Sequence, residues 1–276
     1  MGWFRSGFTI NVFRTGIVLS RLYKKAKMVR GAMITAVIPA YNEEQRLGAV
    51  LEVLSQTPEL TQIIVVDDGS GDGTPKIVKS HSGQDPRIEL ISLPTNRGKG
   101  RAMVTGAESS QSDIILFIDA DLIGLRPDHL TALIEPVQRD GCAMTLGLFH
   151  KDTDQARPSH RLAPFLSGQR CLRWSLFRAV PKLEATAWSI EVALSLYAWR
   201  QRYPVTLVSW PGVHHLERWH KRGRILAYGS YVKMWLDIGL YVLTCFLVNP
   251  PRLKRSQPGS HRTVWQPRSK GATHEN

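Results

Sequence analysis

Two carboxylates, Asp119 and Asp121, stand two residues apart directly after the apolar run Ile114–Ile118. Five large apolar residues in a row predict a strand that is buried on both faces, as in a parallel sheet. The region past the carboxyl end of such a strand is where open α/β sheets bind ligands. Paired carboxylate oxygens suit Mg²⁺ or Mn²⁺, which commonly bind together with substrate phosphates. An acid pair at a strand end can equally be a solvated turn or a helix cap, so the pair alone does not decide the chemistry.

A second pair of acids, Asp67 and Asp68, follows the apolar run Ile63–Val66. Carboxylates at this position can accept hydrogen bonds from a nucleotide base or from ribose hydroxyls. Capping of the next helix would use the same residue types, but it accounts for only one member of the set formed by Asp67, Asp68 and Ser70. We therefore treat both acids as candidate binding residues.

Two further loops carry side chains suited to a nucleotide. Lys99 stands between Gly98 and Gly100, which lets its ammonium approach a phosphate closely, although an exposed loop lysine would show the same pattern. The loop from Pro39 to Glu43 can set the ring of Tyr41 against a nucleotide, or it can be a plain turn between strand and helix. Neither loop is specific by itself.

The elements that must position these loops alternate between strand and helix at intervals of about 25–30 residues, which predicts a doubly wound, mostly parallel α/β sheet. The expected strands are Met33–Ile38, Ile63–Val66, Ile88–Ser92, Ile114–Ile118 and Cys142–Phe149. The expected helices are Glu44–Leu54, one with Thr74 as its N-cap, one through Met103 and Ala107, and Pro127–Arg139. Each of these polar loops follows a strand, so we expect all of them along one edge of the sheet.

The second half of the chain is less regular. Ser167–Arg170 precedes an expected helix over Cys171–Val180, and a further helix is expected over Ile190–Arg200. A strand over Val205–Val208 leads to His214 and His215. The apolar stretch Leu226–Val248 is interrupted by Lys233 and Asp237, so it predicts a helix that lies on a membrane or packs on the domain more readily than one that spans a membrane.

The net charge of +13 lies almost entirely at the two ends of the chain. Residues 1–42 hold seven Lys or Arg and no acid, and residues 251–276 hold six and one acid, so the 276-residue chain has a nearly neutral body. Such a body argues against nucleic-acid binding. Basic ends beside apolar segments favour an anionic membrane surface, although solvated tails would have the same composition.

These patterns divide the chain into four parts. We expect a basic amphipathic extension over 1–30, the main domain over 31–225, an apolar helix over 226–250 and a basic disordered tail over 251–276. Three widely spaced cysteines imply neither a disulfide framework nor a zinc site and fit a reducing compartment. The expected location is therefore the cytoplasmic face of a membrane, with the protein attached peripherally.

Four segments in order resemble the family 2 glycosyltransferases, which have the GT-A fold. They are VIPAYNEE at 37–44, VVDDGSGDGT at 65–74, NRGKG at 96–100 and DADL at 119–122. The resemblance covers about residues 33–150 and is nearest the branch of polyprenyl-phosphate (dolichyl-phosphate-type) sugar synthases. It implies a Rossmann-like, mostly parallel sheet with helices on both faces. It also implies that Pro39, Tyr41, Glu43, Asp67 and Asp68 hold a nucleoside-diphosphate sugar, and that the DXD motif of Asp119 and catalytic Asp121 holds Mg²⁺ or Mn²⁺ against the diphosphate.

Residues 160–225 resemble the family more loosely. Ser167–Arg170 is similar to an S-G-F-R segment, which makes Arg170 a candidate for a phosphate, while an arginine at a helix start can equally be a surface charge. Glu191 falls where related enzymes have an acid near the acceptor; it could be a general base or a partner of the helix dipole. Ile123 replaces a glutamine that the polyprenyl-phosphate branch often has, so His215, or less readily His214, becomes a more plausible metal ligand.

The function that these features predict is metal-dependent transfer of a sugar from a nucleoside-diphosphate sugar to a lipid-linked or membrane-proximal acceptor. A catalytically inactive nucleotide-sugar-binding protein at the membrane is the alternative. A sugar nucleotidyltransferase fits less well, because it normally has a glycine-rich loop near its N-terminus and residues 37–44 contain no glycine. The sequence leaves the donor base, the sugar, the acceptor and the stereochemical outcome open.

Overall fold

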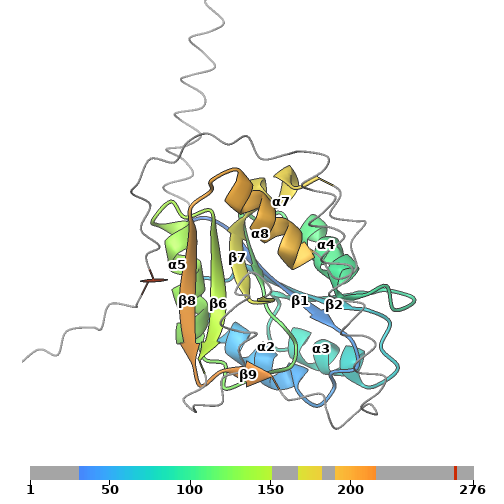
Figure 1. The fold of residues 1–276 in the computed structure, drawn as a ribbon. Helices are drawn as coiled ribbons and strands as arrows, with labels where there is room; N and C mark the ends of the chain where they lie inside the picture. Colours follow the sequence, from blue (N-terminus) through green and yellow to red (C-terminus); the bar gives the residue numbers. More distant parts are fainter. Residues whose placement is uncertain (1–30, 151–166, 182–189, 216–263, 266–276) are drawn as a thin grey trace, which may run out of the picture. The chain divides into compact units, whose positions relative to one another are not determined.

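The computed structural model describes residues 31–150, 167–181, 190–215 and 264–265 (Figure 1). The chain divides after Ala32, and the unit from Met33 onward contains all of the described helices and strands.

The described strands form an eight-stranded sheet in the order β10–β8–β6–β7–β4–β1–β2–β3. Their bounds are Ile34–Ala40 for β1, Gln62–Asp67 for β2, Ile88–Ser92 for β3, Ile114–Phe117 for β4, Met144–His150 for β6, Arg170–Arg173 for β7, Val205–Pro211 for β8 and Val264–Trp265 for β10. Strand β7 pairs antiparallel with β4 and β6, and the other pairings in this sheet are parallel. The predicted α/β class with a mostly parallel sheet is confirmed.

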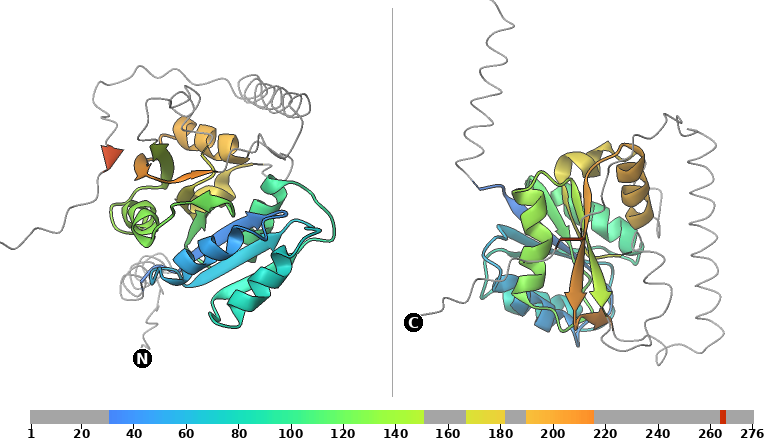
Figure 2. Two further views of the ribbon diagram at one scale, coloured as in Figure 1. Left: turned by 90° about the horizontal axis from the view of Figure 1, so that it is seen from below. Right: turned by 60° about the vertical axis from the view of Figure 1, so that its left-hand side comes forward.

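Helices cover both faces of the sheet, as the two-sided burial of its strands requires. Their bounds are Leu47–Ser55 for α2, Thr74–Ser82 for α3, Lys99–Ser109 for α4, Pro127–Gln138 for α5, Trp174–Ala179 for α7 and Ile190–Arg200 for α8. One apolar cluster joins α4, α7 and α8 to Val37, Phe117 and Leu172 of the sheet. Figure 2 shows α5 on the opposite side of the sheet from α8.

A second, two-stranded sheet pairs β5 (Leu122–Ile123) antiparallel with β9 (His214–His215), so that Leu122 lies opposite His215. The chain leaves β5 through Gly124, whose φ of +75° is in the left-handed region that favours glycine. A Cβ atom at Gly124 would also lie 2.3 Å from the carbonyl oxygen of Gly212. Gly124, which follows β5, therefore packs directly against Gly212, just before the two histidines of β9.

The structure corrects two local predictions. The expected helix over Cys171–Val180 is wrong, because residues 170–173 form β7 and the helix begins only at Trp174. Cys171 and Leu172 are both completely buried between β4 and β6. Pairing with these two strands therefore stabilises an extended conformation here and not a helix. Thr74 is the first residue of α3 and not its N-cap, and its hydroxyl accepts the backbone N–H of Glu43 instead.

Several predicted segments lie outside the described residues. They are the extension over 1–30, the apolar helix over 226–250 and most of the tail over 251–276, of which Val264 and Trp265 pair with β8. Within the described ranges, no helix has both the length and the apolar character needed to cross a membrane.

A glycine in α4 controls how closely that helix approaches the sheet, because a Cβ at Gly106 would lie 2.4 Å from Val37 and 2.9 Å from Val66. We expect Gly106→Ala to lower the free energy of unfolding by about 1–3 kcal/mol, because buried strand side chains must shift. Gly48→Ala in α2 is the matched control: its Cβ would meet only ordinary contacts at 3.5 Å or more, so the change should be neutral or stabilising by up to about 1 kcal/mol. Urea denaturation of both variants tests this, and equal effects would contradict the packing.

Candidate functional site

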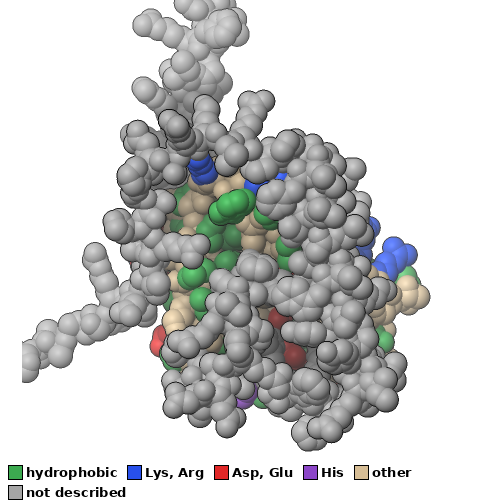
Figure 3. Space-filling view, in the orientation of Figure 1, with side chains coloured by type: hydrophobic (Ala, Val, Ile, Leu, Met, Phe, Trp, Pro, Cys, Tyr) green, Lys and Arg blue, Asp and Glu red, His purple; other side chains and the backbone are tan. Residues whose placement is uncertain are grey.

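The register of three parallel strands brings the two acid pairs to one edge of the sheet. Strand β1 lies between β2 and β4, with Ala40 opposite Asp67 and Val37 opposite Phe117. Asp119 follows β4 by two residues and is therefore level with the end of β1. Two strand spacings separate the acid pairs across the sheet, or roughly 10 Å. In the space-filling view, acidic side chains are visible in the lower part of the molecule (Figure 3).

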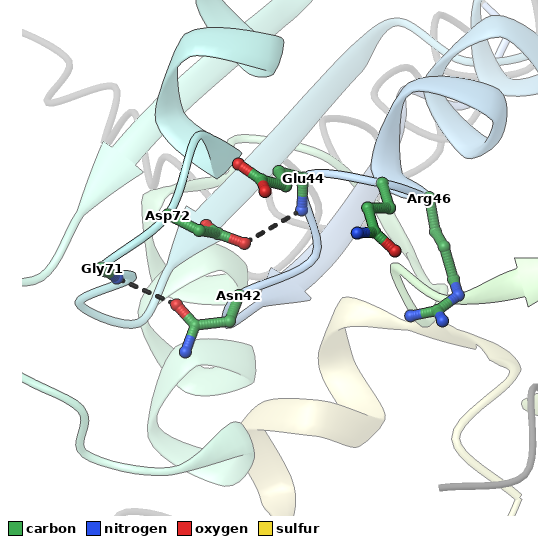
Figure 4. Close-up of a pocket in the computed structure, with 6 residues that line it drawn as sticks. Asn42, Glu44, Arg46, Gly71 and Asp72 are labelled. Atoms are coloured by element: carbon green, nitrogen blue, oxygen red, sulfur yellow. Dashed lines mark hydrogen bonds between the residues drawn. The ribbon is translucent and has the colours of Figure 1, made fainter. Parts of the chain in front are cut away.

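The loop after β1 and the loop after β2 are joined by hydrogen bonds. The backbone N–H of Asn42 donates to Ser70 Oγ at 2.9 Å, and that of Gly71 donates to Asn42 Oδ1 at 2.9 Å. Glu43, whose carboxylate pairs with Arg46, donates its N–H to Thr74. An open pocket of about 420 Å³ adjoins this junction (Figure 4). Its lining consists of Asn42, Glu44, Gln45, Arg46, Gly71 and Asp72.

The residues predicted to contact a nucleoside differ in exposure. The side chain of Tyr41 is 43% exposed, whereas Asp67 and Asp68 are buried at the end of β2. Asp68 accepts the N–H groups of Arg97 at 2.8 Å and Gly98 at 2.7 Å, and Asp67 accepts that of Ser70 at 3.1 Å. Asp67 therefore stabilises the loop that follows β2, and Asp68 holds the segment that leads into α4. Each carboxylate oxygen can accept a further hydrogen bond, so nucleotide binding by these acids stays a prediction.

Lys99, Asp119 and Glu191 form a charged cluster at the same edge. The ammonium of Lys99, at the start of α4, lies 2.7 Å from Asp119 Oδ1 and 3.1 Å from Glu191 Oε1. Burial favours the neutral amine, but the two carboxylates outweigh it and raise the pKa of Lys99 above its ordinary value. The sequence predicted a phosphate ligand in Lys99 and a general base in Glu191; the structure pairs the two with each other.

Gln169 is the residue of this site that sequence reasoning missed. Its side chain is completely buried; its amide accepts the backbone N–H of Asp119 at 3.0 Å and donates to Asp119 Oδ2 at 2.7 Å. A single amide thus fixes both the backbone and the carboxylate of Asp119. Its only sequence signal is its place in the Ser167–Arg170 segment, one residue before Arg170, the predicted phosphate ligand.

Arg170 is completely buried, which excludes the surface-charge interpretation. Its guanidinium donates to the carbonyl oxygens of Ser167 and Glu191, and so ties the start of β7 to the first turn of α8. Burial lowers the pKa of Arg170 to about 10, against the effect of Glu191 and Asp119, so the group stays charged at neutral pH. Its predicted contact with a phosphate would require these bonds to rearrange.

The acids of the DXD segment offer oxygen ligands of the kind that Mg²⁺ and Mn²⁺ prefer. Asp121, which the structure buries, lies one residue before β5, and the pairing of β5 with β9 brings the backbone of His214 and His215 beside it. His214 is exposed, and the side chain of His215 is outside the described part. Within that part, no group of three His, Cys, Asp or Glu side chains is arranged to hold a metal. The two aspartates have the donor chemistry that such an ion prefers, and their binding of a metal, like a third ligand from β9, remains a prediction.

An aromatic contact supports the strand that leads to the histidines. The His129 ring stacks on Trp210 of β8 at 5.5 Å between centroids, and the Trp210 side chain is completely buried. His129 Nδ1 accepts the N–H of Arg126 at 3.2 Å, while its Nε2 is buried without a hydrogen-bond partner among the described residues. Burial, and next the charge of Arg126, lower the pKa of His129 to about 4, with Asp128 acting in the opposite direction.

The family model for glycosyl transferase family 2 matches residues 35–204, and the chain belongs to that family. The match covers β1 to the end of α8, and so includes both acid pairs, Lys99, Gln169 and Glu191.

Individual relatives are similar over shorter stretches. A dolichyl-phosphate beta-glucosyltransferase of Trichomonas vaginalis is 42% identical over 96 residues, which cover 32% of this chain and 28% of the relative. The human dolichyl-phosphate beta-glucosyltransferase is 40% identical over 107 residues, 34% of this chain and 33% of the relative. The matched stretch thus spans about a third of the length of these curated relatives.

A solved structure shares the fold over most of the chain. Glucosyl-3-phosphoglycerate synthase of Mycobacterium tuberculosis, in complex with Mn²⁺, UDP-glucose and phosphoglyceric acid, superposes with a TM-score of 0.61. The two sequences are 22% identical, and the match covers 86% of each chain. The common architecture is the GT-A-like arrangement that the sequence motifs imply.

Stability should fall in acid because His129 resists protonation in the folded protein. The folded pKa of about 4 lies below the ordinary value of 6.5, so the unfolded chain takes up a proton first as the pH falls between these values. The free energy of unfolding should drop by up to about 3 kcal/mol over this window from this group alone. His129→Phe should lack that decline. Urea denaturation of both proteins from pH 7 to pH 4.5 tests this, and a difference between them that does not change with pH would contradict it.

The amide of Gln169 should matter more to stability than an amide at the surface. We expect Gln169→Leu to lower the free energy of unfolding by about 2–3 kcal/mol, because the N–H of Asp119 and one carboxylate oxygen lose their buried partner. Gln84→Leu is the matched control, since Gln84 is an exposed glutamine just after α3 and its loss should cost under about 1 kcal/mol. Chemical denaturation compares them; similar losses would show that Gln169 does not hold Asp119.

Proposed function

We propose that the chain transfers a sugar from a nucleoside-diphosphate sugar to an acceptor that carries a phosphate, with Mg²⁺ or Mn²⁺ as cofactor. The observation that carries this proposal is the gathering of Lys99, Asp119, Gln169 and Glu191 beside the joined loops 39–44 and 67–74. The relatives that are dolichyl-phosphate glucosyltransferases support a polyprenyl-phosphate acceptor, and the ligands of the solved structure support UDP-glucose as the first donor to test.

The donor has a natural orientation along this edge. The exposed ring of Tyr41, with Pro39 and Glu43 in the same loop, would provide a wall for the base. Asp67 and Asp68, at the end of β2, would accept hydrogen bonds from the nucleoside hydroxyl or N–H groups. The diphosphate would then lie toward β4, near the first turn of α4, whose backbone N–H groups attract anions. Arg170 would act behind this surface, by holding Ser167 and α8 in place.

The proposed metal ligands are Asp119 and Asp121, with His215 as the third candidate. When bound, the ion would neutralise negative charge on the departing diphosphate. Gln169 orients the carboxylate of Asp119 for this task, because it occupies Oδ2 and fixes the backbone N–H.

In the transfer step an acceptor oxygen forms a bond to the anomeric carbon of the sugar. The bond from that carbon to the diphosphate oxygen breaks, and the nucleoside diphosphate leaves with the electron pair. An acceptor phosphate is already anionic and needs no base. A hydroxyl acceptor would need one, and the nearest acid, Glu191, is paired with the ammonium of Lys99 at 3.1 Å. The Glu191 carboxylate is therefore already engaged by a cation, which favours an acceptor that needs no base.

A membrane-proximal acceptor fits the charge distribution of the whole chain. Thirteen Lys or Arg residues lie in the two ends of the sequence, and these ends suit an anionic bilayer surface on its cytoplasmic side. The near-neutral body between them gives no reason to include nucleic acid among the partners.

Transfer should depend on the divalent ion and on Asp121. We expect the purified full chain with Mn²⁺ or Mg²⁺ to consume one of a panel of UDP- and GDP-sugars when a polyprenyl phosphate in detergent is added. Phosphoglyceric acid, which carries a hydroxyl as well as a phosphate, serves as the soluble acceptor for comparison. Asp121→Asn should reduce turnover at least about 100-fold through loss of a metal ligand. Asp140→Asn, which changes an exposed acid after α5, should retain the parental rate.

The readouts separate the proposal from its alternative. Donor binding by calorimetry without any turnover would favour a nucleotide-sugar-binding protein. A rate that chelation of the metal and Asp121→Asn both leave unchanged would refute the metal role.

A further inference from the structure

The ammonium of Lys99 occupies the position between two acids of the site. It lies 2.7 Å from Asp119 Oδ1 and 3.1 Å from Glu191 Oε1, and the three residues come from the start of α4, the loop after β4 and the first turn of α8. The side chains of Asp119 and Glu191 are only 15% and 11% exposed. Lys99 thus contacts two poorly hydrated carboxylates directly, and the charge of the buried Arg170 acts on both of them as well.

The surroundings fix Asp119 but leave Lys99 able to move. Gln169 holds Asp119 Oδ2, and the backbone of Gly168 packs so closely that a Cβ there would lie 2.7 Å from Lys99 Nζ and 2.8 Å from Asp119 Oδ2. The lysine side chain is 36% exposed and has a flexible four-carbon stem. If one member of the pair changes position, it is the ammonium and not the carboxylate.

We propose that Lys99 competes with a divalent cation for Asp119, and that a bound diphosphate relieves the competition by giving the ammonium another anionic partner. The inference rests on the proposed function, since it concerns the same site. The ammonium of Lys99 pairs with Oδ1 of Asp119, and the amide of Gln169 donates to Oδ2 of the same carboxylate. A doubly charged ion on this carboxylate would therefore stand within a few ångströms of the ammonium, and the two positive charges repel.

The helix start allows this exchange without a change in the backbone. Gly98, with a φ of 90°, turns the chain into α4, and its N–H is fixed by Asp68. Rotation about the side-chain bonds of Lys99 therefore suffices to move the ammonium from Asp119 toward a phosphate near the first turn of α4. Lys99 would then link binding of the metal to binding of the nucleotide, so that each strengthens the other.

The test measures Mn²⁺ binding and needs no sugar transfer. Electron paramagnetic resonance titration of the full chain, with and without UDP, gives the affinity for Mn²⁺ in each condition. Wild type should bind Mn²⁺ weakly alone and at least about tenfold more tightly with UDP. Lys99→Met should bind Mn²⁺ alone at least about tenfold more tightly than wild type and should gain much less from UDP.

Two further variants control for charge and folding. Lys79→Met, an exposed lysine in α3, makes the same change in net charge and should bind as wild type does. Lys99→Arg keeps the positive charge and should stay near wild type, and Lys99→Gln replaces Lys99→Met if that variant does not fold. Equal Mn²⁺ affinity of wild type and Lys99→Met without UDP would overturn the inference even if the enzyme transfers sugar. Absence of transfer, with the predicted Mn²⁺ pattern present, would instead overturn the proposed function alone.

Discussion

The parallel register of β4, β1 and β2 is the constraint on which the site depends. With Val37 opposite Phe117 and Ala40 opposite Asp67, the three strands end at nearly the same level, and their loops must share one edge. A shift by one residue would turn every side chain of a strand to the other face. Because these strands are buried on both faces and α4 packs closely at Gly106, such a shift is opposed along their whole length.

Arg170 and Lys99 both lie near this edge of the sheet, but they differ in burial and in the groups that they contact. Arg170 is completely buried and donates to the carbonyl oxygens of Ser167 and Glu191, so its charge is committed to the scaffold. Lys99 is partly exposed, and its ammonium pairs with the carboxylates of Asp119 and Glu191. Arginine suits the first role because its planar donors reach several carbonyls at once, and lysine suits the second because a compact ammonium on a long stem can change partners.

The sequence was sufficient for the parallel part of the fold because that part has strong local signals. The apolar run before Asp119 and the one before Asp67 mark strands buried on both faces, and the structure has both. Strand β7 has no such signal: it has four residues with an arginine at each end, and its partners β4 and β6 lie far away in the chain. The antiparallel insertion, the burial of Arg170 and the contact of Gln169 with Asp119 arise together from that pairing, so local periodicity could not reveal any of them.

The pairing of β5 with β9 gives Ile123 a structural role. Residue 123 lies in β5, opposite His214, where a β-branched side chain favours the extended strand. The amide that reaches the DXD segment belongs to Gln169, directly before β7, which contacts Asp119. Position 123 is then available to pair with β9, which keeps His214 and His215 at the edge where the proposed metal ligands lie.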